Sequence, residues 1–405
     1  MIFVTGPRQA GKTTLVLQAL ADIPPSNREY IPIDEPGQGT LPAFPGQTGS
    51  PQGPLAETVD TLRGEPGANW IRSLWEKARE QARRLENGFV LVFDEIQQIP
   101  DWSPTVKGLW DRDRINGTRL HVILLGSAPL LMQKGMAKES MTGRYITVHV
   151  PHWSFTEMRE AFGFSLEQYL YFGGYPGGAS YIHQQSQWRK FIADAIIEPN
   201  IERDILAMEQ IKNPALLKLL FELGVECSGQ IMSYTKMLGE LRGKGHTTTL
   251  IRYLDLLSKS NLVTGLQKYS NAPHLRKHSS PKLNVLNTAF IPLLSDYTFE
   301  EAQADRSFWG RLVESAVGAH LHNTQNPSSK LYYWREKDYE VDFVLKRGPK
   351  LIAVEVKSGR KRSYPPGLRK IKTRFEDVVP VLVGANGMSL SKFLSIPARD
   401  LPEGL

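Results

Sequence analysis

Residues 6–13 read Gly-Pro-Arg-Gln-Ala-Gly-Lys-Thr, and this stretch decides the fold of the first part of the chain. It matches the pattern G-x-x-x-x-G-K-[S/T] at every fixed position. The apolar residues 2–5 predict a strand before it, and apolar residues at helical spacing predict a helix after it over 13–20. The glycines let backbone N–H groups turn inward around phosphate oxygens, and the helix N-terminus adds its positive end. The sequence therefore predicts a phosphate-binding loop between a strand and a helix.

We expect this loop to bind ATP and Mg²⁺ through its backbone and two side chains. Lys12 would bridge the β- and γ-phosphates, and the Thr13 hydroxyl would ligate the metal ion. The alternative is a glycine-rich turn that fits the pattern by chance. The residues predicted to bind the nucleotide are Gly6, Pro7, Arg8, Gln9, Ala10, Gly11, Lys12, Thr13 and Thr14.

Two acidic residues follow the apolar segment 89–93, which predicts a strand. Mg²⁺ needs a carboxylate at the end of a neighbouring strand, and we assign Asp94 to this role. Glu95 would polarise the water that attacks the γ-phosphorus. An acid pair in this position could instead cap a helix.

Two further polar residues are candidates for the reaction. Ser127 follows a predicted strand over 120–125, where it would sense the γ-phosphate or stand as an ordinary turn serine. Arg144 would act as an arginine finger that stabilises charge on the transferred phosphoryl group. A surface ion pair is the alternative role for this arginine.

The order of predicted elements indicates an α/β fold in the first 150 residues. Apolar strands alternate there with helical segments, a pattern typical of a parallel sheet covered by helices on both faces. Residues 36–67 contain 13 Gly or Pro in 32 positions, which indicates an irregular insertion. Segment 155–223 is helical in pattern, and 233–269 follows the order of a winged helix. From residue 308 onward, a helix and three strands predict a separate α/β domain.

Acidic residues on the predicted C-terminal strands form a second candidate site. Asp342 is followed by Glu355 and Lys357, in the D…(D/E)-x-K arrangement of metal-dependent nucleases. Two carboxylates can hold Mg²⁺ against a scissile phosphate, and the lysine can orient the attacking water. Glu314, on the preceding predicted helix, is a third acid. Two alternatives stay open: the charged residues face solvent, or the domain binds nucleic acid without cleaving it.

Composition and charge restrict the class of protein. The chain has 405 residues, 41% hydrophobic and 22% charged, which predicts a folded protein of several domains. Its one cysteine, Cys227, excludes an intrachain disulfide, and no apolar segment is long enough to cross a membrane, so we expect a cytoplasmic protein. The formal net charge is +7, and segment 330–374 alone holds 14 Lys and Arg against 5 Asp and Glu. This basic segment favours DNA binding and ordinary solvated surface about equally.

Taken together, these motifs resemble the AAA-type ATPases of bacteria and archaea that carry a C-terminal domain of unknown function. The resemblance covers nearly the whole chain and implies an ATPase domain (1–150), a helical region (151–225), a winged-helix-like region (226–300) and a restriction-endonuclease-like domain (301–405). The stretches that carry it are GPRQAGKT (6–13), FDEIQQIPDW (93–102), LGS (125–127), TGR (142–144), WSFTE (153–157), FGGYP (172–176), IERDI (201–205), LVES (312–315), YEVDFV (339–344) and VEVKSG (354–359).

Two features depart from the family. Its members usually have further residues before the first strand that help to hold adenine, whereas here the predicted strand begins at residue 2. Either the start is truncated or adenine is held differently. The Gly/Pro-rich segment 36–67 is also longer than the family pattern predicts.

Three functional hypotheses follow. In the first, the protein hydrolyses ATP with Mg²⁺, and its nucleotide state rearranges the winged-helix and nuclease-like parts on DNA. In the second, it is an ATP-dependent binding switch with negligible turnover and an inactive nuclease-like recognition domain. In the third, the C-terminal domain is a nuclease gated by ATP. A homo-oligomer is compatible with each, because an arginine finger can act between copies.

Overall fold

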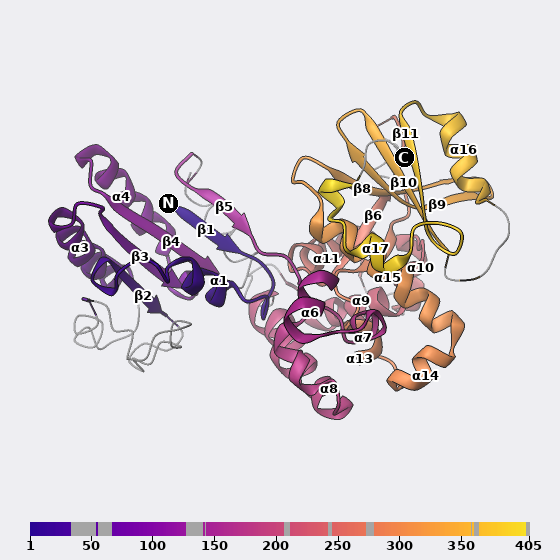
Figure 1. The fold of residues 1–405 in the computed structure, drawn as a ribbon, viewed down its shortest axis with the longest axis horizontal. Coiled ribbons are helices and arrows are strands. Elements are labelled where there is room, and N and C mark those ends of the chain that lie inside the picture. Colours follow the sequence, from indigo (N-terminus) through magenta and orange to yellow (C-terminus); the bar gives the residue numbers. More distant parts are fainter. Residues whose placement is uncertain are drawn as a thin grey trace. The chain divides into compact units, whose positions relative to one another are not determined.

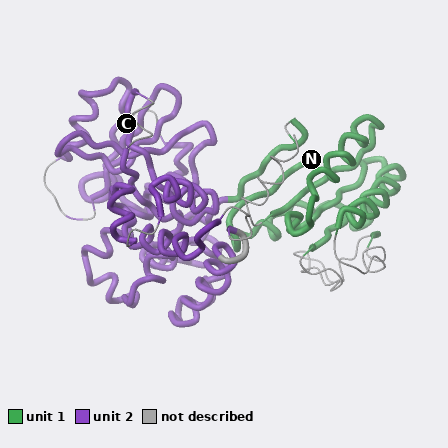
Figure 2. Tube along the Cα trace, turned by 180° about the vertical axis from the view of Figure 1, so that it is seen from behind, with its two compact units in different colours: residues 1–150 green, residues 151–405 purple. Residues whose placement is uncertain are grey.

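The computed structural model describes residues 1–33, 54–55, 67–126, 141, 143–205, 211–241, 245–272, 279–357, 359 and 364–401, and of 202–204 only the backbone. The chain forms two compact units, 1–150 and 151–405 (Figure 2). Ser127 and most of the Gly/Pro-rich segment 36–67 lie outside the described residues. Within the described ranges, no helix has the length and hydropathy needed to cross a membrane.

Unit 1 is built on a parallel sheet of five strands (Figure 1). Its strands are β1 (Ile2–Thr5), β2 (Arg28–Pro32), β3 (Phe89–Asp94), β4 (Leu120–Gly126) and β5 (Ile146–His149). They lie in the order β2-β3-β4-β1-β5, and every neighbouring pair runs parallel. The predicted parallel α/β fold of this part is confirmed. Because the strands share one direction, Thr5 and Asp94 end at one edge of the sheet, while Ile2 and Phe89 begin at the opposite edge.

Helices cover both faces of this sheet. They are α1 (Lys12–Ala19), α3 (Ala68–Arg84) and α4 (Trp102–Asn116). Successive strand residues point to opposite faces. Val4 and Val92 therefore pack in one core cluster with residues of α1, and Phe3 and Leu91 pack in another with residues of α3 and α4. Packing against the sheet holds α1 in place, with its N-terminus at the end of the loop that precedes it.

Unit 2 contains a mixed sheet of six strands. Its strands are β6 (Val263–Lys268), β7 (Lys282–Val285), β8 (Lys330–Glu336), β9 (Tyr339–Arg347), β10 (Lys350–Lys357) and β11 (Val378–Gly384). They lie in the order β11-β10-β9-β8-β6-β7. The β10–β11 and β6–β8 pairs are parallel, and the other neighbouring pairs are antiparallel. The three strands predicted in the C-terminal part are thus present as β8, β9 and β10.

The helices of unit 2 precede the first strand of this sheet in the chain or follow its later strands. They are α6 (Phe155–Phe162), α7 (Leu166–Phe172), α8 (Gln185–Ile192), α9 (Pro214–Glu226), α10 (Tyr234–Glu240), α11 (Thr247–Lys259), α13 (Phe290–Leu293), α14 (Phe299–Ala304), α15 (Arg306–Thr324), α16 (Pro366–Arg374) and α17 (Leu390–Leu394). The predicted helical character of 155–223 is present from α6 to α9. The helices α6, α7 and α14 each begin with a capping box, in which a Ser or Thr side chain and the side chain three residues later bond to each other's backbone N–H groups.

The segment interpreted as a winged helix has the expected order of elements, but its hairpin pairs with a further strand. Helices α10 and α11 are followed by β6, which pairs antiparallel with β7. However, β6 also pairs with β8, through Gln267 with Tyr332 and Lys268 with Tyr333. The hairpin is therefore part of the larger sheet and does not stand free as a wing. The sheet draws strands from both sides of residue 300, where we predict a domain boundary.

Helix α15 lies against this sheet at close range. Val313 and Val317 share a core cluster with Phe343 and Val354 of the sheet. A Cβ at Gly318 would come within 2.4 Å of the Asn284 Oδ1 atom, so only glycine lets the helix approach β7 this closely. The approach sets one face of α15 beside β7, β9 and β10.

Candidate functional site

The predicted phosphate-binding loop leaves β1 at the carboxyl edge of the unit 1 sheet and enters α1. Gly6 has a φ of 155°, and a Cβ there would lie 2.0 Å from the backbone oxygen of Val150. Gly11, just before α1, has a φ of 80°. These conformations are costly for any residue with a side chain. The path of the chain therefore requires the two fixed glycines of the motif.

Lys12 is held inside this loop. Its side chain is buried, and its Nζ atom donates hydrogen bonds to the backbone oxygens of Gly6 at 3.2 Å and Pro7 at 2.8 Å. Both acceptors are residues of the loop itself. The ammonium thus lies within the turn of backbone that is expected to surround the phosphates.

Asp94 meets the loop from the end of β3. Its Oδ2 atom accepts hydrogen bonds from the Thr13 hydroxyl at 2.8 Å and from the Tyr30 hydroxyl. Burial raises the pKa of the Asp94 carboxyl, while the bonds from Tyr30 and Thr13 act in the opposite direction. Tyr30, on β2, was missed by the sequence analysis. It could have been found only by knowing that β2 lies next to β3.

Glu95 follows directly after Asp94 in a left-handed backbone conformation, with a φ of 59°. Its backbone N–H donates to Asp94 Oδ1 at 2.9 Å, and its carboxylate accepts a hydrogen bond from Gln97 Nε2. The side chain is half-buried. Glu95 therefore lies at the same edge of the sheet as the loop, next to the carboxylate that contacts Thr13.

Arg144 lies at the opposite edge of the sheet. It precedes β5, whose first residue, Ile146, bonds to the backbone oxygen of Met1. Its guanidinium binds both carboxylate oxygens of Asp111 on α4, at 2.7 and 3.0 Å, and this bond lowers the pKa of Asp111. The structure therefore does not bring Arg144 to the loop of its own chain, and it shows the ion pair that was the alternative role. Ser127 lies outside the described residues.

We expect Gly6→Ala to lower the free energy of unfolding of unit 1 by about 2 kcal/mol or more, because the new methyl group meets the Val150 carbonyl. Gly108→Ala is the matched control. Gly108 lies in α4 with nothing within 4 Å of an added Cβ, so this change should raise stability by about 0.5–1 kcal/mol. Denaturant titration followed by tryptophan fluorescence measures both. Equal stability of the two variants would contradict the assigned loop conformation.

In unit 2, the structure brings the four C-terminal candidates into one cluster. Lys357 Nζ lies 2.6 Å from Glu355 Oε1, and Asp342 Oδ2 accepts a hydrogen bond from the Val356 N–H at 2.8 Å. Glu355 is buried, and burial together with the nearby charge of Asp342 raises its pKa to about 7. Glu314 reaches the same place from α15. Glu355 and Lys357 are two positions apart on β10, so they share one face of the strand, as this pairing requires.

A second lysine, which the sequence analysis missed, stands at the centre of the cluster. Lys282, on β7, has a fully buried side chain, and its Nζ atom lies 2.7 Å from Glu314, 3.3 Å from Asp342 and 3.7 Å from Glu340. Burial alone would lower the pKa of the Lys282 ammonium, but Asp342, Glu314 and Glu340 outweigh it and raise the pKa. No motif marks this residue, because it comes from a strand outside the D…(D/E)-x-K pattern.

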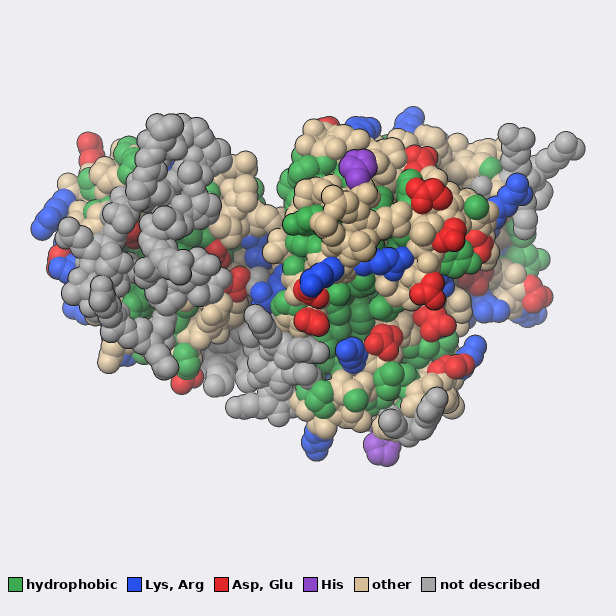
Figure 3. All heavy atoms as spheres, turned by 90° about the horizontal axis from the view of Figure 1, so that it is seen from below, with side chains coloured by type: hydrophobic (Ala, Val, Ile, Leu, Met, Phe, Trp, Pro, Cys, Tyr) green, Lys and Arg blue, Asp and Glu red, His purple; other side chains and the backbone are tan. Residues whose placement is uncertain are grey.

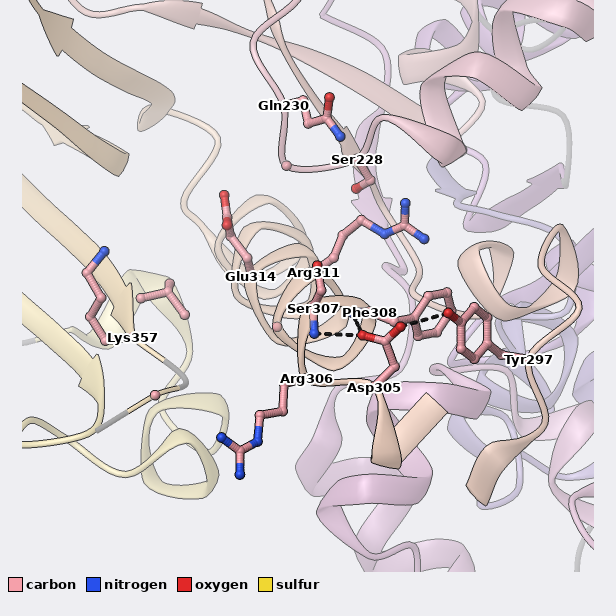
Figure 4. A pocket seen from close by; sticks show the side chains of 14 residues that line it. Ser228, Gln230, Tyr297, Asp305, Arg306, Ser307, Phe308, Arg311, Glu314 and Lys357 are labelled. Carbon is pink, nitrogen blue, oxygen red and sulfur yellow. Dashed lines mark hydrogen bonds between the residues drawn. The ribbon is translucent and has the colours of Figure 1, made fainter. Parts of the chain in front are cut away.

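A cavity of about 710 Å³ opens beside the cluster (Figure 4). Glu314, Arg306 and Arg311 line it from α15, and Lys357 lines it from the end of β10. Arg311 is fixed by a hydrogen bond to the backbone oxygen of Glu226 at 2.7 Å. The cavity is therefore polar and lined by three cationic side chains near the carboxylates.

Comparisons with known protein families match three stretches of the chain. Residues 57–159 match the family described as AAA domain, a stretch that contains Asp94 and Glu95 but not the phosphate-binding loop. Residues 163–300 and 309–397 match two families described as domains of unknown function, DUF8612 and DUF4143.

Whole-chain similarities are more distant. Uncharacterized proteins of Mycobacterium bovis and Mycobacterium tuberculosis are each 25% identical over 382 residues, which are 93% of this chain and 74% of theirs. The Walker-type ATPase of Pyrococcus abyssi aligns with a TM-score of 0.45 and 14% identity, over 72% of this chain and 90% of that chain. Cdc6p of Pyrobaculum aerophilum aligns with a TM-score of 0.30 and 15% identity, over 66% of this chain and 81% of that chain. Structural alignments this loose do not assign a fold to the whole chain. The loop motif, the strand order and the match over 57–159 together identify residues 1–150 as a P-loop domain of the AAA type.

Proposed function

We propose that residues 1–150 bind ATP with Mg²⁺ and hydrolyse it, and that the nucleotide state rearranges the C-terminal unit on DNA. One observation carries the ATPase part. The Thr13 hydroxyl of the P-loop and the Asp94 carboxylate of β3 lie 2.8 Å apart, so the two expected oxygen donors to the metal converge beside Lys12. Hard oxygen donors of this kind suit Mg²⁺.

Each residue has a distinct role in this proposal. The Lys12 ammonium exchanges its backbone acceptors at Gly6 and Pro7 for phosphate oxygens. Thr13 and Asp94 would hold Mg²⁺, which would supply charge neutralisation on the phosphates. Tyr30 orients Asp94 through its hydrogen bond. Glu95 accepts a proton from the attacking water, and Gln97 restrains its carboxylate.

The DNA-directed part of the proposal rests on charge. Segment 330–374 has nearly three times as many basic as acidic residues, 14 against 5. On the face of the protein shown in Figure 3, Lys and Arg side chains of unit 2 lie among Asp and Glu side chains. The proposed DNA contacts include cationic groups such as Arg306 and Lys357, which line the polar cavity.

The test of this function is steady-state ATP turnover by the purified protein with Mg²⁺, with and without double-stranded DNA. Turnover that rises with DNA supports the coupled ATPase. Turnover below about one per minute under both conditions, with intact ATP binding, would replace it by the binding switch. No ATP binding at all would refute both.

We expect Arg144→Ala to leave turnover within about two-fold of wild type at low protein concentration, because Arg144 lies at the sheet edge away from its own P-loop. The partly exposed pair with Asp111 should contribute little to stability, because solvent screens it. Turnover measured against protein concentration, with Asp111→Ala as the matched control, distinguishes the roles. A loss in Arg144→Ala alone that grows with concentration would show that the arginine acts on the nucleotide of a second copy.

A further inference from the structure

The carboxylate cluster of unit 2, formed by Glu314, Asp342 and Glu355, needs a cation to balance its negative charge. The identity of this cation does not depend on ATP hydrolysis. A metal-dependent nuclease needs Asp342 and Glu355 to share a divalent ion. Both oxygens of Asp342 are already engaged by the chain itself, Oδ1 by Lys282 Nζ and Oδ2 by the Val356 N–H. Among the residues that the structure describes, no group of three or more His, Cys, Asp or Glu side chains is placed to hold a metal ion. The residues present therefore do not fit Mg²⁺.

Lys282 has the position and the charge to take the place of such an ion. Its ammonium lies between Glu314 of α15 and Asp342 of β9, with Glu340 farther away, and it also lies 5.0 Å from the centre of the Phe343 ring. A fully buried cation so close to Asp342 repels any divalent ion that would bind there. Glu314 and Glu340 are partly exposed, so water screens the negative charge that Lys282 does not balance.

Lys357 is also engaged within the cluster. Lys357, which would orient water in an active nuclease, instead pairs with Glu355 at 2.6 Å. One oxygen of Glu355, Oε2, has no hydrogen-bond partner among the described residues. A single carboxylate oxygen, next to one that is paired with a lysine, is a poor site for a hard divalent cation, which prefers several oxygen ligands.

We propose that Lys282 is the built-in cation of this cluster, so that the nuclease-like site is metal-free and does not cleave nucleic acid by a metal-dependent route. The carboxylates then serve to hold β7, β9 and α15 together around the ammonium.

The experiment compares four full-length proteins, freed of metal and nucleotide: wild type, Asp342→Asn, Lys282→Met and the Lys282→Met/Asp342→Asn double variant. Calorimetric titration with Mn²⁺ measures binding, and thermal unfolding with and without Mn²⁺ measures the coupling to stability. Any Mn²⁺ bound at Asp94 in unit 1 is common to all four and cancels. Wild type and Asp342→Asn should bind Mn²⁺ equally. Lys282→Met should gain one Mn²⁺ site, and the double variant should lose it.

Without metal, Lys282→Met should unfold about 10 °C below wild type, because it leaves the buried carboxylates without a cation, and Mn²⁺ should restore part of that loss. Lys282→Arg keeps the charge and should gain no site. If Lys282→Met does not fold, the proposal is tested by comparing wild type with Asp342→Asn alone. The two proteins are compared in Mn²⁺ binding and in nicking of supercoiled plasmid. A wild-type Mn²⁺ site that Asp342→Asn removes, nicking that depends on Asp342, or a folded Lys282→Met that gains no site would each overturn the proposal.

Discussion

Replacing Glu95 with glutamine is expected to lower ATP turnover by about 10³-fold while ATP affinity stays within about two-fold of wild type. Glutamine has nearly the same size as glutamate and can keep a hydrogen bond with Gln97, but it cannot accept a proton from the attacking water. Asp94, Thr13 and Lys12 are unchanged, so binding of the nucleotide and its metal should survive. The measurement is turnover from phosphate release together with ATP affinity from calorimetry.

The matched control is Glu86→Gln, the same chemical change in the exposed turn before β3. It lies at the opposite end of the strand and should leave both quantities unchanged. If Glu95→Gln retained more than about a tenth of wild-type turnover, another group would have to activate the water. Weakened ATP binding in this variant would instead place Glu95 among the residues that hold the nucleotide.

Lys12→Ala should weaken ATP binding by about 100-fold and abolish measurable turnover. A charge-assisted hydrogen bond is worth roughly 1.5–3 kcal/mol, and the lost ammonium makes more than one such bond to phosphate oxygens. The alanine also leaves the backbone oxygens of Gly6 and Pro7 without their buried donor, which should loosen the loop. Calorimetric titration with ATP and Mg²⁺ measures the affinity.

Lys77→Ala on the exposed side of α3 is the matched control, since it removes the same charge from unit 1 at a solvent-facing position. It should bind ATP as wild type does. Lys12→Arg tests whether charge alone suffices. The larger, planar guanidinium does not fit the buried space inside the loop, so we expect no recovery of affinity. ATP affinity within about three-fold of wild type in Lys12→Ala would refute the assignment of this loop.

The nucleotide site was predictable in its local parts and not in its remote ones. The motif at 6–13 and the acids after β3 each consist of a few neighbouring residues. Both can therefore be recognised in the sequence. Tyr30 contacts the same Asp94 oxygen as Thr13 but is separated from Asp94 by 64 positions. That contact exists because β2 pairs with β3, and strand order is a property of the folded sheet.

Arg144 illustrates a different case, in which a sequence motif gave a candidate residue but not its position in space. The stretch TGR resembles a family motif, yet parallel strands put the start of β5 at the edge that lies away from the P-loop. A residue before a parallel strand and a residue after its neighbour are separated by the length of the strands. The sequence alone gave no sheet order from which to see this.

Sequence by itself determined the P-loop, the acidic end of β3, the C-terminal strands and the D…(D/E)-x-K spacing of Asp342, Glu355 and Lys357. Each follows from backbone periodicity or from glycine conformations, which neighbouring residues settle. Only the tertiary structure decided that Lys282 stands among the carboxylates, 60 positions before Asp342 and on a strand from the other side of a predicted boundary. The physical reason is that a buried charge is balanced by whatever group the packing of β7 and α15 brings within a few ångströms, and no local pattern of residues records that packing.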